Sequence, residues 1–196
     1  MHRFDAHTVL LVVDVQNDFA NPGGALAVDG GESVVPAINE EIGGAIEAGA
    51  LVVATQDWHP PSTPHFAKDG GIWPVHCVAD TWGAELHPGL ALPDDARRVR
   101  KGSNGEDGYS GFTMRDPVTG EEAATELDRI LRDRKVTRVV VCGLATDYCV
   151  KATALDAARL GYDAELMVDG IAAVNLEPGD GDRALEEMRA AGVKVP

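Results

Sequence analysis

The sequence predicts an α/β fold in which a mostly parallel sheet carries helices on both faces. Apolar runs rich in β-branched residues alternate along the chain with segments whose apolar residues recur at helical spacing. The runs at Thr8–Val15 and Arg138–Cys142 are almost continuously apolar, which is typical of strands buried on both faces of a parallel sheet. We find no internal repeat and no long linker, so the 196 residues are expected to form a single domain over residues 1–196.

The individual elements follow from these local patterns. Strands are expected at Thr8–Val15, Leu51–Ala54, Arg97–Arg100, Arg138–Cys142 and Ala164–Val168, with a short last strand at Val193–Val195. Helices are expected at Ser33–Ala48, at Glu121–Arg134, from Thr146 to about Leu160, and at Asp182–Ala191. In the first helix Ile38, Ile42 and Ile46 share one face. Gly49 and Gly161 follow the first and third helices, and glycine commonly ends a helix.

The segment at about 55–95 departs from this alternation. It holds most of the prolines, all three tryptophans and four of the six histidines, and it shows little regular periodicity. A long irregular stretch inside a compact domain is usually functional. We therefore expect this loop-rich segment to carry a metal-binding site.

Charge and composition exclude several classes of function. The formal net charge is −15 and the sequence pI is near 4.6, whereas nucleic acid and anionic membranes are bound through positive patches. No apolar run approaches the roughly 20 residues that span a bilayer, and the first residues lack a signal-peptide pattern. The three cysteines make a poor disulfide framework, and we interpret Cys77 and Cys142 as core residues. We expect a cytoplasmic protein that acts on a small molecule.

A nucleotide-binding function is only weakly supported. No dinucleotide-binding glycine fingerprint follows the first expected strand, and no phosphate-binding loop pattern occurs in the sequence. The nearest glycines, in the segment 22–24, lack the required spacing. The architecture resembles that of nucleotide-binding proteins, but the motifs do not.

Polar and reactive side chains follow the carboxyl ends of several expected strands. Asp14 ends the first apolar run, and Asp57 and His59 follow the second. Lys101 follows the third, and the segment GLATDYCV (143–150) follows Arg138–Cys142. In open α/β sheets ligands bind outside these strand ends. We therefore expect a carboxylate, a pair of metal-ligand side chains, an amine and a thiol to meet at one edge of the sheet.

Cys149, within GLATDYCV, has two interpretations. It is either a nucleophile or a small apolar residue on a buried helix face, since cysteine is among the most often buried residue types. With Thr146 as the N-cap, Cys149 lies in the first helical turn, where backbone N–H groups and the helix dipole lower a thiol pKa. Lys101 would stabilise the thiolate, and Asp14 would accept the thiol proton. The turn alone leaves the two interpretations evenly balanced.

The histidines of the loop-rich segment suggest a metal site. Asp57 and His59 stand two residues apart, and His65 and His76 follow them. A carboxylate with imidazoles suits a divalent metal such as zinc, iron or manganese. The alternative is a set of loop histidines that bond to backbone groups. For Asp57, His59 and His76 we favour the metal.

These segments, in this order, resemble those of the isochorismatase-like cysteine hydrolases, in particular the nicotinamidase/pyrazinamidase branch. The matching segments are LLVVDVQNDF (10–19), PGGALAV (22–28), ATQDWHP (54–60), WPVHC (73–77), Lys101-Gly102 with YSGF (109–112), and GLATDYCV. They cover nearly the whole chain, and the set is more specific than any one segment. The resemblance implies the family's Rossmann-like three-layer sandwich. It also implies hydrolysis of nicotinamide, and of pyrazinamide, through a cysteine thioester.

The resemblance further implies catalytic roles. Cys149 would be the nucleophile, Asp14 the general acid/base and Lys101 the group that stabilises the thiolate. The Leu144–Ala145 bond matches a cis peptide of the family, and the backbone amides of Ala145 and Cys149 would form an oxyanion hole. No role is assigned to Tyr148, whose position differs among members.

Ligand-binding roles are implied as well. Phe19, Trp73 and Tyr109 match aromatic walls of the substrate pocket. One divalent metal ion would be held by Asp57, His59, His76 and His65, the last at a position that varies within the family. Family members range from monomers to larger assemblies, so the resemblance leaves open whether this chain forms a homo-oligomer. It also leaves open whether the enzyme serves NAD salvage.

Two rival functions remain. One is an isochorismatase-like amidase that acts on a ureido or N-carbamoyl substrate, which would share the set of Asp14, Lys101 and Cys149. Such substrates carry carboxylates and usually need an arginine in the pocket, whereas the metal set favours a pyridine amide. The other rival is a non-catalytic, metal-binding relative, against which the intact catalytic set argues.

Overall fold

The computed structural model describes residues 2–196 and contains a five-stranded sheet in the order β3-β2-β1-β6-β7. The strands are β1 (Thr8–Val13), β2 (Leu51–Asp57), β3 (Arg97–Lys101), β6 (Arg138–Leu144) and β7 (Asp163–Ala172). All neighbouring strands in this sheet run parallel. The central strand β1 is buried along its whole length, as its apolar sequence requires. The predicted parallel α/β sheet is confirmed.

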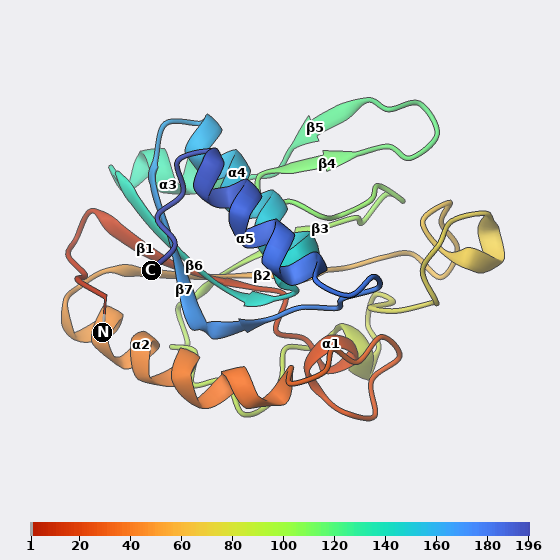
Figure 1. Ribbon diagram of the computed structural model, residues 1–196, viewed down its shortest axis with the longest axis horizontal. Helices are drawn as coiled ribbons and strands as arrows, with labels where there is room; N and C mark the ends of the chain where they lie inside the picture. The colour runs from red at the N-terminus through yellow and green to blue at the C-terminus, as the bar shows by residue number, and fades with distance from the viewer. Residues whose placement is uncertain (1) are drawn as a thin grey trace.

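Helices cover both faces of the sheet (Figure 1). The helices are α1 (Asn17–Ala20), α2 (Val35–Glu47), α3 (Leu127–Asp133), α4 (Lys151–Arg159) and α5 (Asp180–Ala190). Helix α2 lies on one face, and α3, α4 and α5 lie on the other. Short 3-10 turns occur at Glu32–Val34, Ala67–Asp69 and Trp82–Ala84. The sheet and its two helical layers form the expected three-layer arrangement.

Alternate residues of β1 contribute to two separate cores, because successive side chains of a strand point to opposite faces. Val9 and Leu11 pack in the core that includes Leu127 of α3 and Met188 of α5. Leu10 and Val12, with Ile38 and Ile42 of α2, belong to the other core. Burying β1 between these cores fixes where its carboxyl end emerges, which is where Asp14 begins the site.

The helix expected at Glu121–Arg134 is wrong in its first half. Glu122–Ala124 forms β5, which pairs antiparallel with β4 (Thr113–Arg115) in a hairpin that projects from the body of the molecule (Figure 1). The apolar residues that suggested a helix all lie in its second half, in α3. Thr125 separates the two parts, since its hydroxyl donates to the Gly111 carbonyl and accepts the Leu127 N–H.

Other boundaries shift without changing the topology. Gly49 and Gly161 follow α2 and α4 with φ of 71° and 88°, so both helix ends are confirmed. The last expected strand is reduced to one bridge between Lys194 and Glu165 of β7. Across residues 2–196, none of the helices combines the length and the apolar character needed to cross a membrane.

Candidate active site and metal centre

The parallel sheet brings the polar residues at its strand ends together. Asp14 follows β1 directly with a φ of 49°. Asp57 and Lys101 end β2 and β3 and are paired in register. Cys149 lies in the turn that follows β6. All of these side chains are buried, so their mutual charges act in a poorly screened environment.

The Lys101 ammonium occupies the centre of this group. Its Nζ lies 2.6 Å from Asp14 Oδ2 and 3.9 Å from Cys149 Sγ. It also donates to Asp57 Oδ1 and to the Gly108 carbonyl. Burial alone would lower the pKa of Lys101, but Asp14 and Asp57 raise it well above its ordinary value. The side chain is therefore a fixed cation.

Two buried carboxylates beside Lys101 have opposite titration behaviour. Burial and the negative charge of Asp57 raise the pKa of Asp14 to about 6, although Lys101 and a 2.6 Å hydrogen bond from the Thr55 hydroxyl oppose the rise. Burial also disfavours the charge of Asp57, but Lys101 and His59 outweigh it and hold the pKa of Asp57 below its usual range. Asp57 therefore stays ionised, whereas Asp14 can exchange a proton near neutral pH.

The turn that carries Cys149 differs from the expectation in two respects. Ala145, not Thr146, is the N-cap, and residues Thr146–Val150 form a π-helical turn before α4. The N–H groups of Tyr148 and Val150 both donate to the Ala145 carbonyl. The cis peptide at Leu144–Ala145 is present.

The expected lowering of the Cys149 pKa is also wrong. Burial raises the pKa of the thiol well above its ordinary value, and the attraction of Lys101 offsets this only in part. Cys149 therefore rests as a thiol and needs a base to become nucleophilic. A carboxylate oxygen of Asp14 lies within 4.8 Å of the sulfur.

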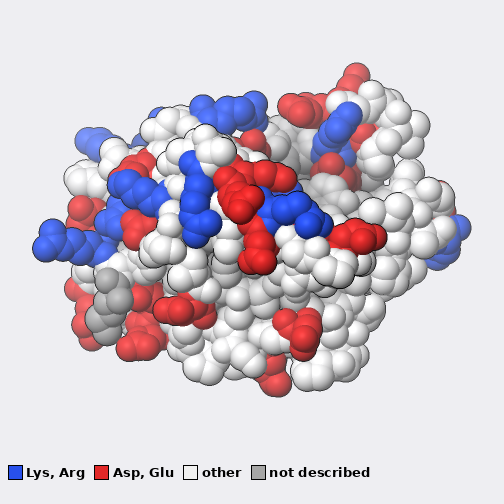
Figure 2. All heavy atoms as spheres, viewed as in Figure 1, with Lys and Arg blue, Asp and Glu red and all other residues white. Residues whose placement is uncertain are grey.

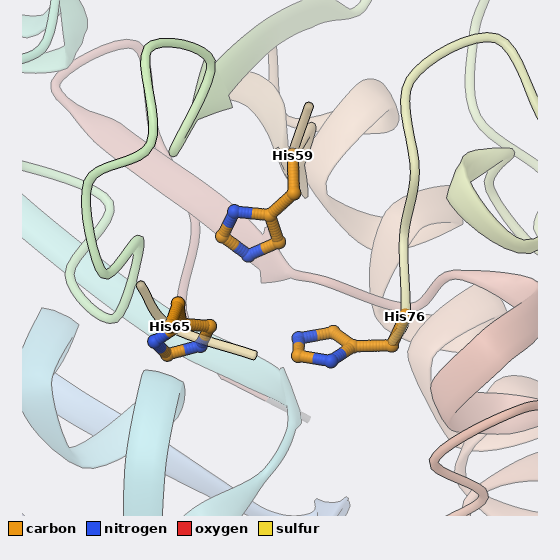
Figure 3. Close-up of side chains that lie close together, drawn as sticks. All are labelled: His59, His65 and His76. Carbon is orange, nitrogen blue, oxygen red and sulfur yellow. The ribbon is translucent and has the colours of Figure 1, made fainter. Parts of the chain in front are cut away.

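Three histidines of the loop-rich segment converge on one point (Figure 3). His59, His65 and His76 are all buried, and one ring nitrogen of each lies within 4.8 Å of the others. Asp57 Oδ2 lies 3.8 Å from His59 Nε2 and 3.9 Å from His76 Nε2. Asp57 therefore faces Lys101 with one oxygen and the histidines with the other.

The side chains of this cluster fit a divalent metal ion. Both ring nitrogens of His59 are buried and lack a hydrogen-bond partner within residues 2–196, which is costly unless another ligand is present. His76 Nδ1 pairs with the Pro74 carbonyl at 2.7 Å, which leaves Nε2 for a ligand. Burial and neighbouring His59 lower the pKa of His65 to about 3, so its ring is neutral, the form that binds metal. A carboxylate with three imidazoles suits zinc, iron or manganese.

A small cavity connects the thiol with this cluster. Residues lining it are Phe19, Leu26, Val28, Asp57, His65, Trp73, His76, Tyr109, Ala145, Tyr148, Cys149 and Val174. The aromatic residues predicted to form its walls all lie there. Trp73 Nε1 donates to the Tyr109 hydroxyl at 2.8 Å. The rings of Tyr148 and Trp73 lie edge to face, with 4.8 Å between their centroids. Ala145 and Cys149, the expected oxyanion-hole residues, lie at the same cavity.

Several residues of the site were not predicted from the sequence. Thr55 and Gly108 bond to the charged cluster, and Tyr148 completes the aromatic wall. A Cβ on Gly108 would lie 2.8 Å from Asp57 Oδ1, so this position has no room for a side chain. Tyr148 directly precedes Cys149 in the expected helical turn. This position was the one signal in the sequence that Tyr148 would lie near the cavity.

A parallel α/β sheet that brings a buried thiol, carboxylate and ammonium together at its strand ends offers the groups that a cysteine-dependent hydrolase uses. The chain belongs to the isochorismatase family, since the protein-family model for the Isochorismatase domain matches residues 8–195.

Relatives and solved structures resemble the chain over nearly its whole length. The nicotinamidase of Escherichia coli is 43% identical over 202 residues, covering 95% of this chain and 92% of the relative. The pyrazinamidase of Pyrococcus horikoshii, in complex with zinc, is 44% identical with a TM-score of 0.86 and covers 97% and 98% of the two chains. A protein of L. infantum in complex with nicotinate is 37% identical with a TM-score of 0.86 and covers 97% and 92%.

Proposed function

We propose that the chain is a nicotinamidase, which hydrolyses nicotinamide to nicotinate and ammonia and also accepts pyrazinamide. The observation that carries this proposal is the shared cavity, which is lined by Cys149 and by His65 and His76. A small heteroaromatic amide in that cavity would meet the thiol at one end and the histidine cluster at the other. A relative named nicotinamidase, a solved pyrazinamidase and a nicotinate complex on the same fold support the assignment.

The substrate matches the lining of the cavity. Nicotinamide is flat, aromatic and uncharged, and Phe19, Trp73 and Tyr109 offer ring faces and edges for it. The metal, for which we favour zinc, would be held by Asp57, His59, His65 and His76. The metal would supply a Lewis acid that attracts the ring nitrogen and orients the ring.

Asp14, Lys101 and Cys149 would carry out the chemistry. Asp14 takes the proton of the Cys149 thiol, and the sulfur attacks the amide carbon to form a carbon–sulfur bond. The backbone N–H groups of Ala145 and Cys149 stabilise the negative oxygen that develops. Asp14 then gives its proton to the departing nitrogen, which leaves as ammonia and creates the thioester.

Hydrolysis of the thioester would use the same base. Asp14 accepts a proton from water, which attacks the acyl carbon; the carbon–sulfur bond then breaks to release nicotinate, and Asp14 returns the proton to the Cys149 sulfur. The pKa of Asp14, raised to about 6, suits a group that takes up and releases a proton in each cycle. Lys101, whose pKa is raised, remains charged throughout and stabilises the anion that forms on sulfur.

The rival ureido and N-carbamoyl substrates fit the cavity less well. Their carboxylates need a cationic partner, but the lining residues of the described chain, 2–196, include no arginine or lysine. The buried Lys101 is already engaged with two carboxylates. The non-catalytic rival does not explain why a thiol, a base and an ammonium are buried together beside the cavity.

Product formation tests the proposal. Purified protein supplied with zinc is incubated with nicotinamide, pyrazinamide, a ureido acid and an N-carbamoyl amino acid, and ammonia and the carboxylate product are measured. We expect rapid release from both heteroaromatic amides, loss of release after chelation and its recovery on adding zinc. Turnover of the ureido or carbamoyl compounds alone would overturn the substrate assignment.

A further inference from the structure

Three consecutive polar side chains after Asp14 are buried without lining the cavity. Gln16, Asn17 and Asp18 are 0%, 2% and 8% exposed, and they belong to the segment VQNDF. Each makes a hydrogen bond to main-chain groups of the loop-rich segment. Asn17 Nδ2, for example, donates to the Trp82 carbonyl at 2.8 Å. Burying a polar side chain is costly unless it is hydrogen-bonded, so these bonds strongly favour one placement of the main chain that they contact.

Gln16 bonds to the main chain of the metal-ligand candidate Asp57. Its Oε1 accepts the Asp57 N–H at 2.8 Å, and its Nε2 donates to the Asp57 carbonyl at 2.8 Å and to the Ala84 carbonyl at 2.9 Å. Strand β1 ends at Val13, whereas its neighbour β2 continues to Asp57. The side-chain amide of Gln16 therefore takes the place of the missing strand partner, donating and accepting as a peptide group would.

Asp18 bonds to the main chain beside the histidine candidates. Its Oδ2 accepts the Cys77 N–H at 2.7 Å, directly after His76. The Cys77 carbonyl in turn accepts the His59 N–H at 3.0 Å. The other oxygen of Asp18, Oδ1, accepts the N–H of Ala25 at 2.9 Å, and Ala25 belongs to a loop that lines the cavity. One carboxylate thus ties together the segments that carry two histidines.

We propose that Gln16 and Asp18 are positioning residues of the metal centre. They do not contact the ligand-binding space. Instead they hold the backbone of Asp57 and of the bonded segments that carry His59 and His76, so that the Asp57 oxygen and these two imidazoles converge before an ion binds. This inference rests on the proposed metal centre, and it assigns a task to the part of VQNDF that the catalytic chemistry leaves unused.

Zinc affinity, measured without substrate, tests the proposal. Gln16→Met keeps the length of the side chain and removes all of its hydrogen bonds to Asp57. Gln56→Met is the matched control, because Gln56 is equally buried, adjoins Asp57 and donates to the same Ala84 carbonyl at 2.9 Å. Competition with a chromophoric chelator should show zinc binding weakened about 10- to 100-fold in Gln16→Met. In Gln56→Met we expect a change of less than about threefold.

A spectroscopic readout separates positioning from a general loss of stability. Cobalt(II) bound in place of zinc reports ligand geometry through its visible absorption. We expect the spectrum of Gln16→Met to differ from that of wild type, and the spectrum of Gln56→Met to match it. Equal weakening in the two variants, or zinc affinity unchanged in Gln16→Met, would overturn the proposal.

Asp18→Asn provides an independent test of the proposal, and it remains available if Gln16→Met does not fold. The change keeps the shape of the side chain and removes one of its two acceptor oxygens, so weaker zinc binding is again expected. Unchanged affinity in Asp18→Asn would contradict the role of Asp18. Wild-type protein that fails to bind zinc would overturn the inference itself. Protein that binds zinc and releases no ammonia would contradict only the proposed substrate.

Discussion

Asp14 is the residue on which the proposed proton transfers depend. It accepts a hydrogen bond from Thr55 at 2.6 Å and lies 2.6 Å from Lys101 Nζ, yet its pKa is raised to about 6. Burial is the main cause, because a low-dielectric environment disfavours the carboxylate. A buried thiol with a raised pKa and a base with a pKa near neutrality together favour transfer of the thiol proton during attack rather than a preformed thiolate.

The titration of Asp14 predicts a limit to activity in acid. Asp14 must be ionised to accept the thiol proton, and its protonated fraction grows as the pH falls through its pKa of about 6. We expect kcat/KM for nicotinamide to be level above that pH and to fall about tenfold per pH unit below it. A pH–rate profile measured with zinc in excess checks this. A level profile down to about pH 4, more than one unit below that pKa, would contradict the assignment of Asp14 as base.

At the scale of residues, the sequence predicted which groups would meet but not how they would titrate. Asp14, Lys101 and Cys149 each follow a strand, and the parallel-sheet rule therefore placed them at one edge. Thr55 was missed because its bond to Asp14 exists only once β1 and β2 pair. The pKa of Cys149 was predicted in the wrong direction because burial, which the sequence does not display, outweighs the nearby ammonium.

Strand β6 and its following turn depend on a close approach to β1. Gly143 pairs with Val13 in the ladder between these strands and has a φ of 112°. A Cβ at this position would lie 2.0 Å from the Val13 carbonyl oxygen. The contact lies directly before Asp14 on one strand and at the first residue of GLATDYCV on the other, so it constrains the spacing of the proposed base and the proposed nucleophile.

Gly143→Ala should therefore destabilise the protein strongly. Left-handed strain and overpacking together predict a loss of about 2–5 kcal/mol in the free energy of unfolding. Gly161→Ala is the matched control, because Gly161 has a φ of 88° but no atom of residues 2–196 within 4 Å of an added Cβ. We expect about 1–2 kcal/mol for that variant. Urea unfolding of both variants checks the difference, and equal losses would show that the collision with Val13 is unimportant.

At the scale of elements, long apolar strands were predicted well and local pairings were not. β1 and β6 were identified because a strand buried on both faces is apolar almost throughout. β5 was missed because its residues are all exposed, so neither apolar periodicity nor burial marks Glu122–Ala124 as a strand. The N-cap at Ala145 was missed because the turn is a π-helical one without a side-chain cap.

The molecule as a whole carries a large negative charge that the proposed reaction does not use. The formal net charge is −15, and Figure 2 shows Lys and Arg among Asp and Glu in the upper part of the view, whereas the lower part shows Asp and Glu alone. A neutral substrate such as nicotinamide is not steered by such a field. A carboxylate-bearing ureido or carbamoyl substrate would be repelled by it.

Salt dependence therefore separates the two substrate classes. We expect kcat/KM for nicotinamide to change less than about twofold between about 0.02 and 0.3 M sodium chloride, since screening alters only the interactions of charged partners. A marked rise of kcat/KM with salt would indicate relief of repulsion and would favour an anionic substrate. Fixed-time assays of ammonia release, at constant pH and zinc concentration, measure kcat/KM at each salt concentration.

For the irregular segment between β2 and β3, the sequence predicted the presence of a metal site but not the contacts that hold the segment in place. Its composition indicated a metal site, and the structure brings His59, His65 and His76 together there. How the segment is held could not be foreseen, because Gln16 and Asp18 act on its backbone from a distant part of the sequence. Such contacts appear only when the chain is folded.

The central claim is that Cys149 is the nucleophile of nicotinamide hydrolysis, and one comparison tests it most directly. Ammonia release from nicotinamide is measured for wild type, Cys149→Ala and Cys142→Ala, each supplied with zinc. Cys142 is another buried, free thiol, within β6, and serves as the control. We expect Cys149→Ala to lose at least about 10³-fold in kcat and Cys142→Ala to stay within about threefold of wild type, because only the former removes the attacking group. Cys149→Ala protein that is folded, binds zinc and still releases ammonia at the wild-type rate would contradict the account.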